Sequence, residues 1–193
     1  MKILGLFNNN CAIPLFDYIE SLGHIVVRIG EPLSADWCKQ QDFDLAVSYT
    51  YKHIISDEVL KIFNGNAVNI HNSYLPYNRG AAPNLWSIAE STPRGVTLHY
   101  MDAQLDKGYI IAQKLITDGD GETLSSSYNN LDYHALELFK EAFKYYEFWP
   151  EMKKKALGKG TYHSVKDTKR LNELIDSYDM RIDDFLNKLK DNK

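Results

Sequence analysis

Short apolar runs alternate with segments of helical periodicity along most of this chain. Residues 2–7 are nearly all apolar and end at three consecutive asparagines, which predicts a strand buried on both faces and its turn. Residues 13–22 carry apolar side chains at helical spacing and are followed by Gly23, a common helix stop. The same reasoning predicts, in order, a strand over 24–28, a strand over 44–49, a helix over 56–63 that begins at Ser56, and a strand over 67–70.

The second half of the chain continues this alternation. A loop rich in turn residues over 72–80 leads to a helix over 83–90, which starts with a proline where the missing N–H costs nothing. The remaining predicted elements are strands over 96–101 and 109–116, a long amphipathic helix over 123–147, a hairpin over 158–165, and helices over 167–175 and 181–190. This pattern predicts an α/β fold with an open, mainly parallel sheet, helices on both faces, and a ligand site at the carboxyl ends of the strands.

The composition is that of one globular domain. The chain has 193 residues, of which 44% are hydrophobic, and a net charge of −4, which argues against a nucleic-acid partner. Its two cysteines form no CxxC pair and have no nearby His ligand pattern, so we expect neither a metal nor a disulfide framework. No apolar run approaches about 18 residues and no leader pattern opens the chain, so we expect a cytoplasmic protein without a membrane partner.

The turn after the first strand argues against a dinucleotide cofactor. A dinucleotide-binding chain carries a G-x-G-x-x-G segment there, because its backbone must approach a pyrophosphate. This chain has Asn8-Asn9-Asn10 at that place. NAD and FAD are therefore not expected.

Three polar residues follow strands where the fold would place chemistry. Asn69 and His71 are two residues apart at the end of a predicted strand, so both side chains point to one face at its carboxyl edge. Asp106 lies in a Leu-Asp-Lys-Gly turn after a later strand. On spacing alone, ordinary turn capping explains these residues at least as well as catalysis.

The segments around these residues resemble the folate-dependent formyltransferase family. NIHNSYLPYNRGAAP contains N-x-H followed by Leu-Pro and Arg-Gly, and GVTLHYMDAQLDKGYI contains G-V-T-x-H and an aspartate in an L-D-x-G turn. The matching residues are Asn69, His71, Leu75, Pro76, Arg79, Gly80, Gly95, Val96, Thr97, His99 and Asp106. Asn72 stands where many members have proline, and Lys107 and Tyr109 replace a common Thr and Asp. These differences leave the catalytic set intact, but the resemblance does not determine the contacts that these loops make.

The resemblance covers roughly residues 1–150 and implies a Rossmann-like formyltransferase fold. We expect a catalytic domain over 1–150 and a short C-terminal extension over 151–193, a hairpin plus helices packed on that domain. The family transfers a formyl group from N10-formyltetrahydrofolate to an amine, so negative charge develops on the carbonyl oxygen and positive charge on the attacking nitrogen.

The resemblance implies a role for each polar residue. Asn69 is expected to donate to the oxyanion, His71 to give or take a proton, and Asp106 to orient the imidazole and hold protons in transit. His99 is expected to hold the Asp106 loop, with direct proton transfer as the alternative.

Two sets of ligand contacts follow from the same resemblance. The folate is expected to contact His53, Ile54 and Ile55 on one wall and Met101, Asp102 and Leu105 on the other. The acceptor is expected to contact Asn9, Asn10, Tyr74, Tyr77 and Arg79. Arg79 suits a phosphate because its guanidinium is always charged, and a salt bridge within the loop is the alternative.

Among the branches of the family, the sugar N-formyltransferases fit best. The 43 residues after Pro150 leave no room for the barrel of methionyl-tRNA formyltransferases, and the first turn lacks the glycine of the glycinamide ribonucleotide enzymes. Residues 160–167, GTYHSVKD, are closest to the sugar branch and also similar to the formylation domain of nonribosomal peptide synthetases.

We therefore expect the acceptor to be a nucleotide-linked amino deoxysugar for a surface glycan, with a pseudaminic-acid-type sugar among the candidates. Another small amine, aminoacyl or ribonucleotide, and an inactive folate-binding protein are the alternatives. Members of the family are often dimers, so a homodimer is expected.

Overall fold

The centre of the molecule is a six-stranded sheet with the order β2-β1-β3-β4-β6-β7. A computed structural model describes residues 1–117 and 122–192. The strands are β1 (Lys2–Leu6), β2 (Ile25–Ile29), β3 (Leu45–Tyr49), β4 (Ala67–His71), β6 (Gly95–Tyr100) and β7 (Ile110–Leu115). The first four are parallel to one another, whereas β6 runs antiparallel to both β4 and β7. The predicted open, mainly parallel sheet is confirmed.

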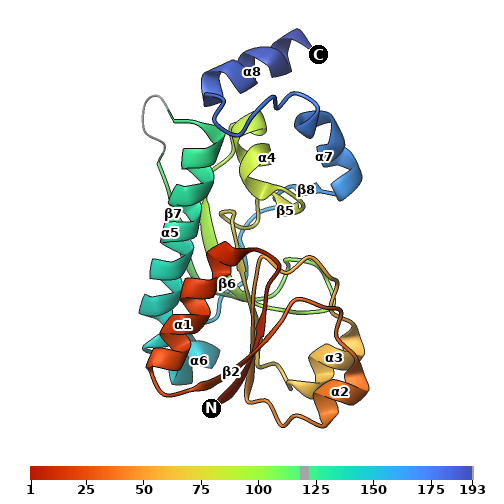
Figure 1. Cartoon of the computed structure of the whole chain (residues 1–193), viewed down its shortest axis with the longest axis vertical. Helices are drawn as coiled ribbons and strands as arrows, with labels where there is room; N and C mark the ends of the chain where they lie inside the picture. Colours follow the sequence, from red (N-terminus) through yellow and green to blue (C-terminus); the bar gives the residue numbers. More distant parts are fainter. Residues whose placement is uncertain (118–121, 193) are drawn as a thin grey trace.

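Helices cover both faces of this sheet (Figure 1). On one face lie α1 (Ile13–Ser21) and α5 (Leu124–Phe143), and on the other lie α2 (Ala35–Lys39) and α3 (Asp57–Ile62). The adjacent strand residues Ile3 and Leu4 belong to the two opposite cores, and both are fully buried. A strand covered on both faces needs apolar side chains at every position, which explains the continuous apolar runs in the sequence.

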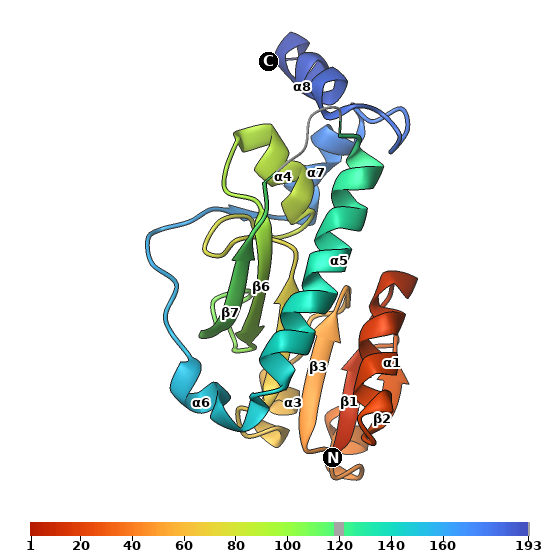
Figure 2. The same ribbon diagram turned by 90° about the vertical axis from the view of Figure 1, so that its left-hand side faces the viewer.

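A third core lies beyond the carboxyl ends of the parallel strands. It is built by α4 (Pro83–Glu90), α7 (Val165–Asn172) and α8 (Ile182–Asp191), which gather at one end of the molecule in Figure 2. Trp86, Leu171 and Phe185 are buried there, one from each helix. The C-terminal residues thus pack against α4, the helix that follows the 72–80 loop.

The expected hairpin over 158–165 is wrong. Instead, β8 (Tyr162–His163) pairs in parallel with β5 (Arg79–Gly80) in a separate two-stranded sheet. The chain approaches that loop closely at Gly160, which has a φ of 61° and where a Cβ atom would lie 2.0 Å from the Pro76 carbonyl oxygen. The partner of β8 is therefore distant in sequence, which a local turn pattern cannot reveal.

Other boundaries differ in smaller ways. The sequence pattern missed α2, although Ser34 caps it by accepting from the Trp37 backbone N–H. The long helix ends at Phe143 rather than at residue 147, and short turns follow it over Tyr146–Phe148 and Trp149–Met152, the latter labelled α6. A further short turn spans Asn10–Ala12 before α1. None of the helices in the described ranges is long and apolar enough to cross a membrane.

Candidate active site

Asn69, His71 and Asp106 come together beside the antiparallel pair of β4 and β6. Asn69 is paired in register with His99 of β6, and its Nδ2 lies 3.3 Å from His99 Nε2. The Asp106 carboxylate reaches both imidazoles, with Oδ2 3.7 Å from His71 Nε2 and Oδ1 3.6 Å from His99 Nε2. The two separate motifs therefore form one cluster, in which His99 contacts two of the three predicted catalytic residues.

The turn that carries Asp106 needs the residue types found in it. Asp106 has a φ of 53°, a left-handed conformation that aspartate tolerates better than most residues. At Gly108 a Cβ atom would lie 1.7 Å from the Tyr100 carbonyl oxygen, so only glycine fits. The carboxylate is then fixed by the backbone N–H of Gly80, which donates to Oδ2 at 2.8 Å.

The hydrogen bonds of His71 identify its protonated nitrogen. Nε2 lies 3.0 Å from the Asn78 carbonyl oxygen, and a carbonyl can only accept, so Nε2 carries a proton. Within the described residues Nδ1 has no hydrogen-bond partner. In the neutral imidazole, Nδ1 is therefore the nitrogen whose lone pair can take a proton.

The same reasoning fixes the roles of His99 and Asn69. His99 Nδ1 lies 2.8 Å from the Tyr100 carbonyl oxygen and must donate to it. Neutral His99 then accepts at Nε2 from the Asn69 amide, which orients that amide and leaves its second N–H available. His99 is almost fully buried, as a structural histidine would be.

The environment of Asp106 favours its charged form. Burial by itself raises the pKa of this carboxyl, but the attraction of His71 and His99 in their protonated forms and the hydrogen bond from the Gly80 N–H lower the pKa by more. The net result is a pKa well below the usual value for aspartate. Asp106 is therefore a carboxylate at neutral pH.

The carbonyl that holds His71 belongs to a buried asparagine. Asn78 is fully buried, and its backbone N–H donates to Thr161 Oγ1 at 2.8 Å. Thr161 Oγ1 in turn donates to Asn78 Oδ1 at 2.9 Å, and Asn78 Nδ2 donates to Thr92 Oγ1 at 2.7 Å. Thr161 precedes β8, so the C-terminal segment helps to fix the partner of the His71 imidazole.

The residues expected to contact folate lie on two neighbouring segments. Ile55 and Met101 are partly buried and pack against the same hydrophobic core. Ile54 and Leu105 are 89% and 52% exposed, so apolar surface is available for a flat ring. His53 Nε2 lies 3.1 Å from the Gly30 carbonyl oxygen, and Asp102 accepts from the Gln104 backbone N–H at 2.8 Å.

The residues expected to contact the acceptor fall into two groups. Asn9 and Asn10 lie in the turn after β1, where the Asn9 side chain accepts from the Cys11 N–H and caps the short helical turn. Tyr74, Tyr77 and Arg79 lie in the loop after β4 and are half-buried. Arg79 Nε donates to the Thr161 carbonyl oxygen at 3.2 Å, and Arg79 forms no ion pair within the described residues.

A partly buried polar cluster next to the site was not predicted from the sequence. Asp132 of α5 accepts from the Tyr49 hydroxyl and, at 3.2 Å, from Asn72 Nδ2. Asn72 directly follows His71, so the cluster ties the end of β4 to α5. Asp132 stands in an amphipathic helix with many polar residues, and no pattern distinguishes it from a surface charge.

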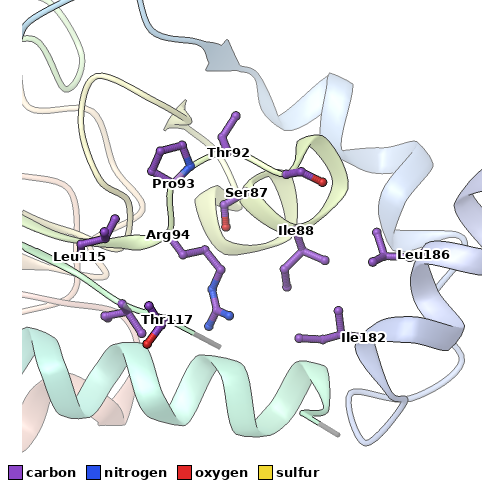
Figure 3. A pocket seen from close by; sticks show the side chains of 11 residues that line it. Ser87, Ile88, Thr92, Pro93, Arg94, Leu115, Thr117, Ile182 and Leu186 are labelled. Carbon is purple, nitrogen blue, oxygen red and sulfur yellow. The ribbon is translucent and has the colours of Figure 1, made fainter. Parts of the chain in front are cut away.

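Two surface cavities lie apart from Asn69, His71 and Asp106, none of which lines them. One, of about 580 Å³, is bounded by α4, the end of β7 and α8, with Ile88, Ile182 and Leu186 around it and Arg94 at one side (Figure 3). The other, of about 500 Å³, lies between α4, β8 and α7. Across residues 1–117 and 122–192 no group of three His, Cys, Asp or Glu side chains is placed to hold a metal ion.

Comparison with known proteins identifies the family of this chain. Residues 28–142 match the family model described as formyl transferase. The formyltransferase PseJ from Anoxybacillus kamchatkensis, solved with UDP-4,6-dideoxy-4-formamido-L-AltNAc and tetrahydrofolate, is 33% identical, with a TM-score of 0.86 over 98% of this chain and 100% of that one.

Two further structures are similar to this chain. Rv3404c from Mycobacterium tuberculosis is 26% identical, with a TM-score of 0.75 over 88% of this chain and 78% of that one. A 4-N formyltransferase from Francisella tularensis shares the fold at 23% identity, with a TM-score of 0.72 over the same shares of the two chains.

Proposed function

Because this chain belongs to the formyl transferase family, we propose that it transfers a formyl group from N10-formyltetrahydrofolate to the amino group of a nucleotide-linked amino deoxysugar. The observation that carries the proposal is the cluster of Asn69, His71 and Asp106 around one point beside β4. The acceptor class is supported by the UDP-sugar and tetrahydrofolate bound to PseJ, which is similar over its whole length.

The residues present fit the formyl donor. The exposed apolar side chains of Ile54 and Leu105 offer surface for the ring system, and Ile55 and Met101 anchor their segments in the core. When bound, the donor supplies the carbonyl carbon that the acceptor amine attacks.

Asn69 is placed to stabilise the negative charge that develops on the carbonyl oxygen. One N–H of its amide is directed at His99 Nε2, so the other is oriented without being used. A donor that is already fixed loses little entropy when the charge appears, which makes it effective in the transition state.

The amine N–C bond forms as the C–N10 bond of the donor breaks, so the proton that the amine loses must reach N10 of the departing tetrahydrofolate, and His71 and Asp106 are placed to carry it. Nδ1 of His71 is the nitrogen able to accept it, while Nε2 keeps its proton on the Asn78 carbonyl oxygen. The positive imidazolium that results lies 3.7 Å from the Asp106 carboxylate, which stabilises it. His99 acts in this scheme as a positioning residue, because its hydrogen bonds fix the Asn69 amide.

Several finer parts of the proposal rest on the resemblance alone. Residues 1–150 form the catalytic domain and 151–193 an extension, the active protein is a homodimer, and the product enters a surface glycan. The other candidates are a different small amine as acceptor and a folate-binding protein without turnover. No observation on this chain favours either of them.

The test is a panel of amines offered with N10-formyltetrahydrofolate, followed by the change in folate absorbance. UDP-linked 4-amino sugars, dTDP-linked amino sugars, glycinamide ribonucleotide and aminoacyl esters separate the acceptor classes, and Asp106→Asn is the matched control. We expect turnover only with nucleotide-linked amino sugars. Turnover with another amine alone would show that the acceptor is not a nucleotide-linked amino sugar. Folate binding without transfer to any amine would overturn the enzyme assignment.

A further inference from the structure

We propose that the cavity between α4, β8 and α7 binds the nucleoside diphosphate part of the acceptor. This inference rests on the proposed function, because it assigns a binding site to the nucleoside diphosphate part of the proposed nucleotide-sugar acceptor. The cavity has a volume of about 500 Å³ and is lined by Trp86, Glu90, Tyr162, His163, Lys166, Asp167 and Arg170. This combination of aromatic rings and basic side chains is what a nucleotide requires.

The basic side chains of the cavity are not neutralised by its acidic ones. Glu90 is engaged with His163 Nε2 at 3.2 Å, and Asp167 accepts from both the backbone N–H and the hydroxyl of Ser164. Lys166 and Arg170 are exposed and form no ion pair within the described residues, and the Arg170 guanidinium lies over the Trp86 ring, 5.3 Å from its centroid. Two cations one helical turn apart on α7 thus remain available for a diphosphate.

The aromatic side chains form a rigid floor and an exposed edge. The rings of Trp86 and His163 stack with centroids 3.7 Å apart and planes within 4° of each other. Trp86 Nε1 donates to Thr168 Oγ1 at 3.0 Å, which fixes this floor to α7. Tyr162 is 54% exposed beside the floor and presents a flat surface to a base.

The cavity is connected to the catalytic cluster through the β5–β8 ladder. Tyr162 is paired in register with Arg79, so the two side chains leave the ladder on the same face. The next residue, Gly80, donates its N–H to Asp106 Oδ2. The two residues of β5 therefore link the cavity to the Asp106 carboxylate, because Gly80 bonds this carboxylate and is paired with His163, which lines the cavity.

The experiment measures binding of UDP and dTDP by calorimetry to the full chain and its variants. Lys166→Ala and Arg170→Ala each remove one cation, and each is expected to weaken binding about tenfold, as the loss of one charge-assisted hydrogen bond does. Tyr162→Ala is expected to weaken binding by about five- to tenfold through lost stacking. Inorganic pyrophosphate is expected to compete with either nucleotide.

Matched controls separate the cavity from general effects. Lys169→Ala removes a cation from the same helix outside the cavity, and Tyr145→Ala removes a tyrosine that is 55% exposed elsewhere. Both are expected to bind UDP or dTDP as the unchanged protein does. Tetrahydrofolate affinity is expected to be the same in every variant.

The outcomes distinguish this proposal from the proposed function. If formyl transfer to a nucleotide-linked sugar occurs and the cavity variants match the controls, the subsite is wrong while the function stands. If the cavity variants weaken nucleotide binding but no amine is formylated, the nucleotide subsite is supported and the proposed formyl transfer is overturned. If neither nucleotide binds to the unchanged protein, the subsite is overturned.

Discussion

Asn69 Nδ2 lies 3.3 Å from Nε2 of His99, its register partner on the neighbouring antiparallel strand. This contact decides which end of the amide faces the histidine, because His99 Nδ1 must donate to the Tyr100 carbonyl oxygen. The amide that we propose as the oxyanion donor is thus oriented by His99.

Replacing His99 tests this positioning role. His99→Ala is expected to lower kcat by about tenfold to a hundredfold while tetrahydrofolate binds as before, since the amide of Asn69 loses its orienting partner. His99→Gln can keep an acceptor for the amide and is expected to recover part of the loss. A fall in folate affinity equal to the fall in kcat/KM would instead assign His99 to ligand binding.

Removing any one of the three catalytic side chains should abolish most turnover. Asn69→Ala, His71→Ala and Asp106→Ala are each expected to lower kcat by at least about 100-fold, the usual cost of losing an oxyanion donor or a general base. Circular dichroism and the melting temperature control for folding. Unchanged turnover in all three variants would remove the proposed mechanism.

The charge of Asp106 should make stability depend on pH in a defined direction. A carboxyl whose pKa is lower in the folded than in the unfolded state stabilises the fold above the unfolded value and loses that effect as the pH falls through the folded one. Asp106→Asn is therefore expected to be less stable than the unchanged protein at pH 7. The difference in free energy of unfolding should shrink below about pH 4. A difference that stays constant from pH 7 to pH 3 would contradict this account.

Thr161 should influence the site although it lies far from it in sequence. Thr161→Val removes the hydroxyl that bonds both the N–H and the side chain of Asn78, and is expected to cost about 1–3 kcal/mol in the free energy of unfolding. Because the Asn78 carbonyl then loses its support, kcat should fall as well. Thr161→Ser keeps the hydroxyl and is expected to restore both quantities. Chemical denaturation and steady-state kinetics measure them.

The two cysteines are expected to react slowly in the folded protein. Burial and the neighbouring Asp132 raise the pKa of Cys11 to about 12, and burial raises that of Cys38. At pH 8 a rise from 9.0 to about 12 lowers the thiolate fraction of Cys11 by about 1,000-fold. Labelling with a disulfide reagent should therefore be slow until denaturant is added. Rapid labelling of Cys11 in the native state would show that neither burial nor Asp132 suppresses its thiolate.

Most of the fold could be predicted from the sequence because its strands are local patterns. A strand covered on both faces is a continuous apolar run, and β1 and β3 show this pattern without help from distant residues. The β5–β8 pairing could not be predicted, since each strand has only two residues and the two lie far apart in the chain. A pairing this short leaves no periodicity to detect.

The sequence could indicate those residues of the site that belong to recognisable family motifs. The family resemblance singled out Asn69, His71 and Asp106, which the fold brings together, whereas spacing alone explains them as turn residues; their catalytic roles stay a prediction. Asp132 and the supporting role of Thr161 were missed, because a buried polar contact depends on which elements the fold brings together and not on the neighbouring sequence.

Neighbouring residues of the C-terminal segment at β8 have two different roles: some hold the 72–80 loop in place, and others line the cavity. Gly160 and Thr161 support the 72–80 loop through close backbone approach and hydrogen bonds, so they tolerate little change. The side chains of Tyr162, Lys166 and Arg170 are exposed and line the neighbouring cavity. Acceptor preference could therefore be re-engineered by exchanging these outward side chains alone, leaving the formyl-transfer machinery as it is.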